Sequence, residues 1–364
     1  MSTFDISKVD KNFAAEDIQY EGIKFYSPKE KPFKIYGLYK PEENEPFKRM
    51  PHEVAQSLNK NVEILYTNTS GGRIRFRTNS TKILVRSILP NLAIAGHMPA
   101  TGSSCFDLYV NGEYISVFRH INKPDLKAIS GANSENTYDS IRTLGKSEMR
   151  DILLFFPLYN DVTDVFIGLD EDAVVEEAPE YTRTKPVVFY GSSITQGGCA
   201  SHPGNAYPNI LSRRFDTDII NLGFSSGAKG EDLMGEYLSN LDMSVLVYDY
   251  DHNASNVEHL EKTHERMFKI IREKQPDLPV IMPTCADRCF KDTIPARREV
   301  IRRTYQNAVD KGDKNVYFID GRTIYAPLGQ GNCTVDDTHP NDLGFLMMAN
   351  SIGAVLEEIF RKER

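Results

Sequence analysis

The sequence predicts a two-domain protein: a β-sandwich over residues 1–180, followed by a doubly wound α/β domain with a five-stranded parallel sheet over residues 181–364. Three observations lead to this fold class. Short alternating apolar runs fill the first half, whereas continuous apolar runs separated by helix-length segments begin near residue 184. A polar stretch over residues 170–186 divides the two patterns and indicates a linker.

The runs of the first half are rich in β-branched and aromatic residues, which is typical of strands with one buried face. We expect strands at residues 62–66, 73–77, 82–86, 106–110, 114–118, 152–156 and 165–168. Asn111-Gly112 lies between two of these runs and predicts a tight hairpin. Few helical patterns interrupt the runs, so they predict an antiparallel, jelly-roll-like sandwich. The first 60 residues either wrap this sandwich or bridge to the second half.

The second half alternates between buried strands and helices. We expect strands at residues 186–190, 219–222, 245–248, 280–282 and 316–319. Ser255-Asn-Val-Glu258 has the pattern of a capping box and predicts the start of one helix, and the last helix is expected after Asn341-Asp342. Continuous apolar strands joined by helices indicate a parallel sheet that is covered on both faces.

Composition excludes several classes of function. The net charge of −8 argues against a nucleic-acid partner. The sequence contains no stretch of about 18 uncharged apolar residues, which is the length that a membrane-spanning helix requires. The first ten residues contain no secretory apolar run, so we expect a cytoplasmic location unless a signal was removed before the numbering begins. Five scattered cysteines predict no disulfide framework, and Cys285-x3-Cys289 lacks the second pair that a zinc site requires.

Polar residues that can take part in catalysis or ligand binding follow the predicted strands. In a doubly wound sheet, ligands bind outside the carboxyl ends of the strands. Ser193 follows the first of these strands, and His339 ends a loop of about 20 residues after the fifth, a length that usually indicates function. A serine hydroxyl needs a histidine base, and that histidine needs a carboxylate. Asp336, three residues before His339, is close enough to provide it.

The same edge of the sheet offers donors for a developing negative charge. A tetrahedral intermediate of acyl transfer carries an oxyanion, which hydrogen-bond donors stabilise. Backbone N–H groups at Ser193 and at Ser226 or Gly227, together with the side-chain amide of Asn253, are the candidates for this oxyanion hole.

Four separated motifs, in order along the second half, resemble the SGNH (GDSL-like) hydrolases. The motifs are Gly191-Ser-Ser-Ile-Thr195, Asn221-Leu-Gly-Phe-Ser-Ser-Gly227, Asn253 and Asp336-x-x-His339. The resemblance implies a flavodoxin-like fold with Ser193 as nucleophile, Asn253 as oxyanion donor, His339 as base and Asp336 as its partner. Cys105-Phe-Asp-Leu-Tyr109 is similar to the Gly-x-Asp-Leu-Tyr signature of the β-rich N-terminal domain of some members.

Three positions depart from the family pattern. Ser192 replaces the usual aspartate before the nucleophile, which removes a charge. The usual glycine after the second strand falls at Ser226, with Gly227 next. The usual Gly-x-Asn-Asp is replaced by Asp251-His-Asn-Ala254, so the loop that carries the asparagine differs in sequence on both sides of it.

The function that we expect is a serine esterase that removes short acyl groups, acetyl in particular, from a carbohydrate, since the two-domain arrangement resembles carbohydrate esterases. The substrate is then a small acylated sugar or oligosaccharide. We expect no metal, cofactor, nucleic acid or membrane to be required. The sequence leaves open whether the chain forms a homo-oligomer. His252 and His202 lie in loops near the same rim as substrate-contact candidates. Asp107 and Tyr109 either pack in a strand or line the site.

Two other classes of function are consistent with parts of the sequence. The Gly- and Ser-rich turn after the first strand is also consistent with a flavodoxin-like cofactor-binding domain, but that function leaves Asp336 and His339 without a role. A glycan-binding protein without activity is a third possibility. Ser192 and Cys199 compete as nucleophiles, Asp249 and Asp251 as a glycosidase carboxylate pair, and His264 is expected in the core.

Overall fold

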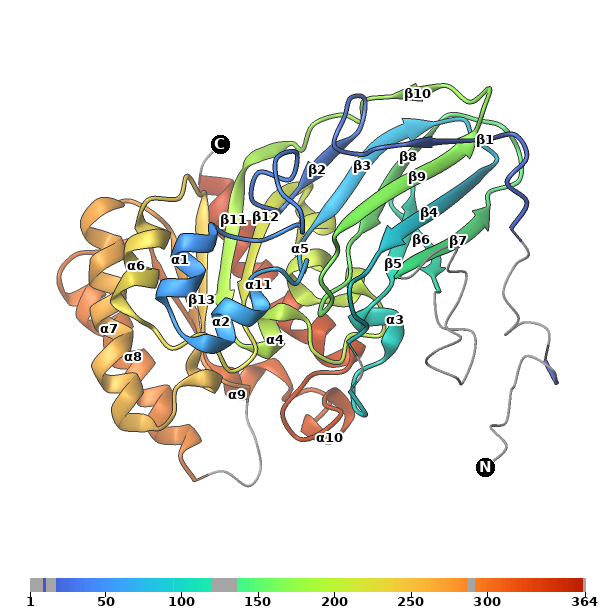
Figure 1. Ribbon diagram of the computed structural model, residues 1–364. Coiled ribbons are helices and arrows are strands. Elements are labelled where there is room, and N and C mark those ends of the chain that lie inside the picture. The colour runs from blue at the N-terminus through green and yellow to red at the C-terminus, as the bar shows by residue number, and fades with distance from the viewer. Residues whose placement is uncertain (1–8, 11–17, 94, 120–135, 287–291, 363–364) are drawn as a thin grey trace. The chain divides into compact units, whose positions relative to one another are not determined.

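The computed structural model describes residues 9–10, 18–93, 95–119, 136–286 and 292–362 (Figure 1). The chain divides into two compact units, one of residues 1–48 and 67–180 and the other of residues 49–66 and 181–364. The predicted division at residue 180 placed residues 49–66 with the first unit. They belong to the second unit because their apolar side chains pack into its core, as described below.

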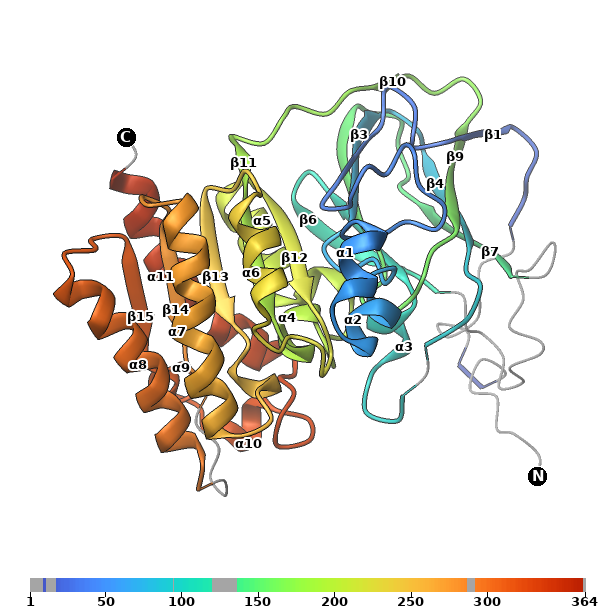
Figure 2. The same ribbon diagram turned by 60° about the vertical axis from the view of Figure 1, so that its left-hand side comes forward.

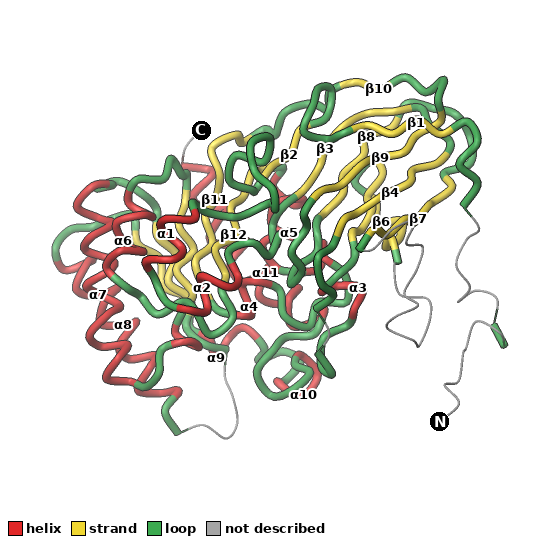
Figure 3. Tube along the Cα trace, in the orientation of Figure 1, coloured by secondary structure: helices red, strands yellow, loops and turns green. Residues whose placement is uncertain are grey.

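The described part of the first unit contains two antiparallel sheets (Figure 3). One sheet has the order β1-β9-β4-β7, and its strands are β1 (Ile23–Tyr26), β9 (Asp164–Asp170), β4 (Lys82–Ile88) and β7 (Thr137–Thr143). The other has the order β10-β3-β8-β5-β6, with β2 also paired to β3. Its strands are β2 (Lys34–Tyr36), β3 (Arg73–Thr78), β5 (Phe106–Val110), β6 (Glu113–Phe118), β8 (Arg150–Phe155) and β10 (Val175–Glu176).

A single hydrophobic cluster joins the two sheets and makes them a sandwich. Alternate residues of both sheets enter it, among them Ile74 and Phe76 of β3 and Val85 of β4, all fully buried. Inward and outward positions alternate along a strand, so the period-two pattern of the sequence is what fills this core. The helix α3 (Ala100–Ser103) precedes β5.

Residues 62–66 form a helix, so the strand predicted there is wrong. The helices α1 (His52–Ser57) and α2 (Lys60–Leu65) lie in this segment of the second unit. The Asn59 side chain accepts hydrogen bonds from the N–H groups of Asn61 and Val62 and so caps α2. Val62 is fully buried in a cluster with Leu222 and Phe224, whereas Leu65 packs at its edge. The three-residue spacing of Val62 and Leu65 suits a helix face.

The second unit is built on a parallel sheet of order β12-β11-β13-β14-β15. Its strands are β11 (Arg183–Gly191), β12 (Thr217–Gly223), β13 (Val245–Asp249), β14 (Val280–Pro283) and β15 (Val316–Ile319). This is the 2-1-3-4-5 order of flavodoxin-like folds, in which the chain reverses direction across the sheet beside its first strand. The carboxyl ends of β11, β12 and β13 therefore meet at one edge.

Helices cover both faces of this sheet. Figure 2 shows α6 (Asp232–Ser239), α7 (Val257–Lys274) and α8 (Ile294–Asp310) on one face, and α5 (Tyr207–Phe215) and α11 (Asp342–Lys362) on the other. Short elements follow the strands at the carboxyl edge: α4 (Ser193–Gln196), the 3-10 turns Pro203–Asn205 and Asp251–Asn253, α9 (Gly321–Ile324) and α10 (Gln330–Cys333). The cap of α7 is Asn256, which accepts from the His259 N–H, and not Ser255 as predicted.

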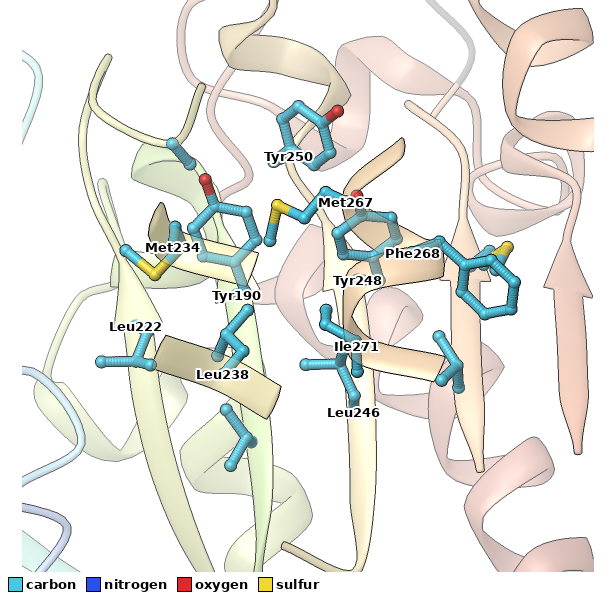
Figure 4. Packing of buried hydrophobic residues seen from close by; sticks show 14 of the residues in the cluster. Tyr190, Leu222, Met234, Leu238, Leu246, Tyr248, Tyr250, Met267, Phe268 and Ile271 are labelled. Carbon is cyan, nitrogen blue, oxygen red and sulfur yellow. The ribbon is translucent and has the colours of Figure 1, made fainter. Parts of the chain in front are cut away.

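Buried tyrosines stiffen the carboxyl half of the sheet (Figure 4). The Tyr190 hydroxyl accepts from the Gly230 N–H at 3.0 Å, and the Tyr248 hydroxyl donates to the His264 carbonyl at 3.0 Å. The Tyr250 hydroxyl pairs with the Thr263 hydroxyl at 2.7 Å. Because each hydroxyl has a partner, these rings bury large apolar surface without leaving a polar group unsatisfied.

One described helix, α11, is long and apolar enough by length and composition to cross a membrane. Half of its most apolar window is buried in the domain, and the helix contacts α5, β14 and β15. Phe360 near its end meets Phe215 of α5 edge-on, with ring centroids 5.5 Å apart. Packing against the sheet therefore accounts for its apolar face.

Candidate active site

The turn from β11 into α4 places Ser193 at the carboxyl edge of the sheet. Ser192 caps α4, its hydroxyl accepting from the Ile194 N–H at 3.2 Å, which is a role that serine and aspartate both fill well. Gly191 leaves no space for a side chain: a Cβ there would lie 2.5 Å from the Asp249 carbonyl and clash with the Thr195 hydroxyl. The glycine thus permits the close approach of this turn to β13.

Ser193 and His339, 146 positions apart in the sequence, meet at this edge. The Ser193 Oγ lies 2.9 Å from His339 Nε2. The other ring nitrogen, Nδ1, lies 2.8 Å from Asp336 Oδ2. When Nδ1 donates its proton to the carboxylate, Nε2 is left as the acceptor for the serine hydroxyl. The three side chains therefore form the hydrogen-bonded series that a serine nucleophile requires.

Asp336 is fixed by the turn that it begins. Its Oδ1 accepts from the Thr338 N–H at 3.1 Å and from the His339 N–H at 2.8 Å. Burial alone would raise the pKa of Asp336, but the hydrogen bonds from the backbone and ring of His339 outweigh burial, and the pKa is lowered. The carboxylate therefore stays ionised beside the imidazole.

Asn253 lies in the 3-10 turn Asp251–Asn253, directly after β13. Its Nδ2 donates to the Phe224 carbonyl at 2.8 Å, which orients the amide and ties this turn to the loop after β12. An amide nitrogen carries two hydrogens, so a second one remains to donate to a ligand.

Charged side chains hold the turn whose sequence departs from Gly-x-Asn-Asp. Asp251 Oδ2 accepts from the Cys285 N–H at 2.8 Å. The guanidinium of Arg297 on α8 donates to the Asp251 carbonyl at 2.6 Å and to the Ala254 carbonyl at 2.8 Å, one on each side of Asn253. Lys229 Nζ donates to the Asn253 carbonyl at 2.6 Å. The altered sequence therefore still gives a turn with its backbone fixed.

The two backbone donors predicted after β12, the N–H groups of Ser226 and Gly227, differ in their surroundings. The Gly227 N–H donates to the Phe224 carbonyl at 2.9 Å inside its own turn, so Ser226 is the better candidate for the oxyanion donor. Ser226 is exposed and has a φ of +55°, the left-handed conformation that glycine adopts most easily. The Ser193 N–H lies in the first turn of α4, where N–H groups point out of the helix.

The competing nucleophiles and carboxylates are placed differently. Burial, and to a smaller extent the charge of Asp336, raises the pKa of the Cys199 thiol to about 12, which leaves it protonated near neutral pH. Asp249 and Asp251 are both buried and point to different partners: Asp249 lies 3.3 Å from the Tyr207 hydroxyl, whereas Asp251 binds the Cys285 N–H. They do not form an open glycosidase pair.

The predicted substrate-contact residues are spread over both units. His252 lies with its Nδ1 3.8 Å from Cys285 Sγ, and it lines a small, mostly enclosed pocket together with Ile194 and Thr338. The His202 carbonyl accepts from the Asn205 N–H, which begins the turn before α5. Asp107 and Tyr109 are buried in β5 of the first unit. A role in binding substrate stays a prediction for all four residues.

Two residues to which the sequence patterns gave no role, Asn221 and Gln196, connect the turn that carries Ser193 to β12 and to the loop after it. Asn221 Nδ2 donates to the Thr195 carbonyl at 2.7 Å, and Gln196 Oε1 accepts from the Ser225 N–H at 2.9 Å. A polar asparagine within an otherwise apolar strand was the available signal. Cys289 of the Cys285-x3-Cys289 pair lies outside the described residues. Among the described residues of the second unit alone, no three potential metal-ligand groups gather closely enough to hold an ion.

Comparison with known proteins identifies both halves of the chain. Residues 184–357 match the GDSL-like lipase/acylhydrolase family, and residues 23–175 match the GxDLY family, described as the N-terminus of the SGNH-hydrolase type of esterase. No curated protein sequence matches the chain.

Solved structures resemble the whole chain. A Bacteroides ovatus protein assigned as a GDSL-like lipase has a TM-score of 0.80 at 27% identity, covering 93% of this chain and 98% of that chain. A salicylyl-acyltransferase from a tetracycline biosynthetic pathway has a TM-score of 0.73 at 20% identity, with the same coverage. An acetyl xylan esterase from the rumen bacterium Butyrivibrio proteoclasticus has a TM-score of 0.56 at 13% identity, covering 92% and 98%. The chain therefore belongs to the GDSL-like (SGNH) hydrolases, as an esterase whose hydrolase domain follows a GxDLY domain.

Proposed function

We propose that this esterase removes short acyl groups, acetyl in particular, from a carbohydrate by a Ser193-His339-Asp336 mechanism. The observation that carries the mechanism is the pair of hydrogen bonds through the imidazole, 2.9 Å to Ser193 Oγ on one side and 2.8 Å to Asp336 Oδ2 on the other. Proton transfer requires heavy atoms at such separations.

In the acylation step, His339 Nε2 accepts the hydroxyl proton while Ser193 Oγ attacks the ester carbonyl. The new C–O bond converts the carbonyl oxygen into an oxyanion. The N–H groups of Ser193 and Ser226 and the Nδ2 group of Asn253 are the donors that stabilise it. The intermediate then breaks its bond to the sugar oxygen, which takes the proton back from His339 and leaves as a hydroxyl.

Deacylation repeats this sequence with water. His339 accepts a proton from the water molecule, whose oxygen attacks the acyl-serine, and Ser193 leaves with that proton as the carboxylic acid is released. Asp336 orients the imidazole and stabilises its cationic form in both steps. The hydrogen bonds that lower the pKa of Asp336 favour this ionised state.

The substrate class is supported by the similarity of the fold to carbohydrate esterases. The fold neighbours include an acetyl xylan esterase and a carbohydrate esterase of family two from Clostridium thermocellum. The pocket beside Ile194, His252 and Thr338 has room for about one water molecule, and neither Ser193 nor His339 lines it. A larger cavity of about 460 Å³ lies between α7 and α8 and contains none of the candidate residues, so we assign no role in the reaction to it.

Hydrolysis of p-nitrophenyl acetate, butyrate and octanoate, and release of acetate from acetylated xylan, test this proposal. We expect the acetate ester to react fastest and Ser193→Ala to lose at least about 10³-fold in kcat. Cys199→Ser is the matched control and should keep its activity, because a protonated thiol takes no part in the reaction. Unchanged activity of Ser193→Ala would contradict the mechanism, and equal rates for all three esters would contradict the short-acyl preference.

A further inference from the structure

We propose that Asn61, on helix α2, is a positioning residue that holds Ser226 in the left-handed conformation needed to aim its N–H at the oxyanion. This inference rests on the proposed function, because it assigns to the 49–66 segment the support of one oxyanion donor. It concerns a residue far from the reaction in sequence, 165 positions before Ser226.

The need for such support arises at Ser226 itself. Its φ of +55° is uncommon for a residue with a Cβ, which is crowded by the backbone in this conformation. Glycine, which has no Cβ, adopts this conformation free of that crowding. A serine persists there only where neighbouring contacts determine the conformation.

Hydrogen bonds fix the peptide groups on both sides of the donor. The Ser226 carbonyl accepts from Asn61 Nδ2 at 3.1 Å, and the N–H at the other end of that peptide, from Gly227, donates to the Phe224 carbonyl at 2.9 Å. Upstream, the Ser225 N–H donates to Gln196 Oε1 at 2.9 Å. The peptide between Ser225 and Ser226, which carries the candidate donor, is therefore held between two anchored neighbours.

Helix α2 is itself firmly attached to this loop. Asn59 caps the helix with Oδ1 and donates from Nδ2 to the Gly227 carbonyl at 2.7 Å. A Cβ on Gly227 would lie 3.1 Å from Val62 Cγ2, so helix and loop are in close contact. At the start of the segment, buried Arg49 donates to the Gly223 carbonyl at 2.6 Å. Figures 1 and 2 show α1 and α2 beside β12 of the same unit.

Among these contacts, the bond from Asn61 is the one that can be removed most cleanly. Asn61 is exposed, whereas Asn59 also caps the helix and Arg49 is buried. If Asn61 acts by offsetting the unfavourable conformation of Ser226, its effect must depend on the residue at 226. Glycine there adopts the conformation unaided and should make Asn61 dispensable.

A double-mutant cycle with Asn61→Ala and Ser226→Gly tests this dependence, measured as kcat and KM for p-nitrophenyl acetate. We expect Asn61→Ala to lower kcat about three- to tenfold with little change in KM, the range that one hydrogen bond of typical net strength supports. In the Ser226→Gly background the same change should lower kcat less than about twofold. Lys60→Ala, the neighbouring exposed position on α2, is the control that should leave kcat unchanged.

Equal losses in both backgrounds, or no loss with Ser226, would overturn the proposal. A purely structural role for Asn61 would lower thermal stability without this dependence of kcat on residue 226. Amide hydrogen exchange of residues 223–228 gives a measurement that does not require turnover. Asn61→Ala should accelerate exchange there while Lys60→Ala does not, and unchanged exchange would also overturn the proposal. Absence of esterase activity in the wild-type protein would instead refute the proposed function.

Discussion

A single carboxylate, that of Asp336, holds His339 at two points. Its Oδ1 accepts the backbone N–H of His339 at 2.8 Å, and its Oδ2 accepts ring Nδ1 at the same distance. The backbone contact fixes the turn, and the ring contact then fixes the orientation of the imidazole relative to that turn. The three-residue spacing of these two residues thus determines both the shape of the turn and the orientation of the imidazole.

The first prediction removes the charge of Asp336 and keeps its shape. Asp336→Asn should lower kcat by about 10²- to 10⁴-fold, since an amide cannot stabilise the imidazolium and can favour the wrong tautomer. Steady-state kinetics with p-nitrophenyl acetate measures this. Asp337→Asn is the matched control, because Asp337 has a φ of +64°, which asparagine tolerates, and its Oδ1 accepts from Gln330. Similar activity in the two variants would contradict the role of Asp336.

A second prediction concerns the turn that carries Asn253. Arg297→Met removes two hydrogen bonds that hold the carbonyls on either side of Asn253, so kcat should fall about tenfold while KM changes little. Arg297→Lys should lie between, because an ammonium lacks the planar fork that reaches both carbonyls. Arg302→Met on the same helix, which removes an exposed pair with Glu299, should have no effect. If Arg297→Met keeps wild-type kcat, the turn is held without this residue.

A third prediction concerns the contact between β12 and the turn that carries Ser193. A Cβ on Gly223 would lie 2.6 Å from the Thr195 carbonyl carbon and would also clash with the backbone nitrogen of Gln196. Gly223→Ala should therefore destabilise the fold by about 1–3 kcal/mol and lower kcat as well, because Ser193 lies on that turn. Chemical unfolding and kinetics measure the two effects. Gly331→Ala, at a position with nothing within 4 Å, should lower neither, and equal behaviour of the two variants would refute the packing argument.

A fourth prediction concerns pH and buried His264. Burial lowers the pKa of His264 to about 3, so the folded protein keeps the ring neutral while the unfolded chain takes up a proton below about pH 6.5. Stability should therefore fall as the pH falls from 6.5 towards 3, by roughly 2 kcal/mol between pH 7 and pH 5 from this residue. His264→Asn, which keeps a partner for the Thr304 hydroxyl, should remove that part of the loss in urea unfolding. An identical loss in the variant would contradict it.

Local patterns were sufficient to predict most of the sheets. Continuous runs such as residues 186–190 and 245–248 are strands because buried parallel strands need apolar residues on both faces. The strand predicted at residues 62–66 was wrong because Val62, Ile64 and Tyr66 alternate as in a strand, whereas Val62 and Leu65 also have helical spacing. Capping by Asn59 favours the helix.

The residues that hold the backbone around the candidate site could not be predicted from the sequence. Asp336 and His339 are three residues apart, so their contact follows from local geometry. Arg297 and Asn61 instead bind backbone carbonyls that lie 43 to 165 positions away. Such contacts leave no periodic signal, because any residue can supply a carbonyl and only the folded chain brings the two together. The use of the Gly227 N–H inside its own turn was likewise hidden.

Covalent labelling tests the central claim most directly. A fluorophosphonate reacts with an activated serine and leaves an adduct that mass spectrometry of peptides locates. The account predicts one adduct per chain, on Ser193, absent from Ser193→Ala and formed far more slowly in His339→Ala. Two results would contradict it. One is a protein that stays active and carries no adduct at Ser193 after prolonged labelling, and the other is an adduct on another residue that abolishes activity.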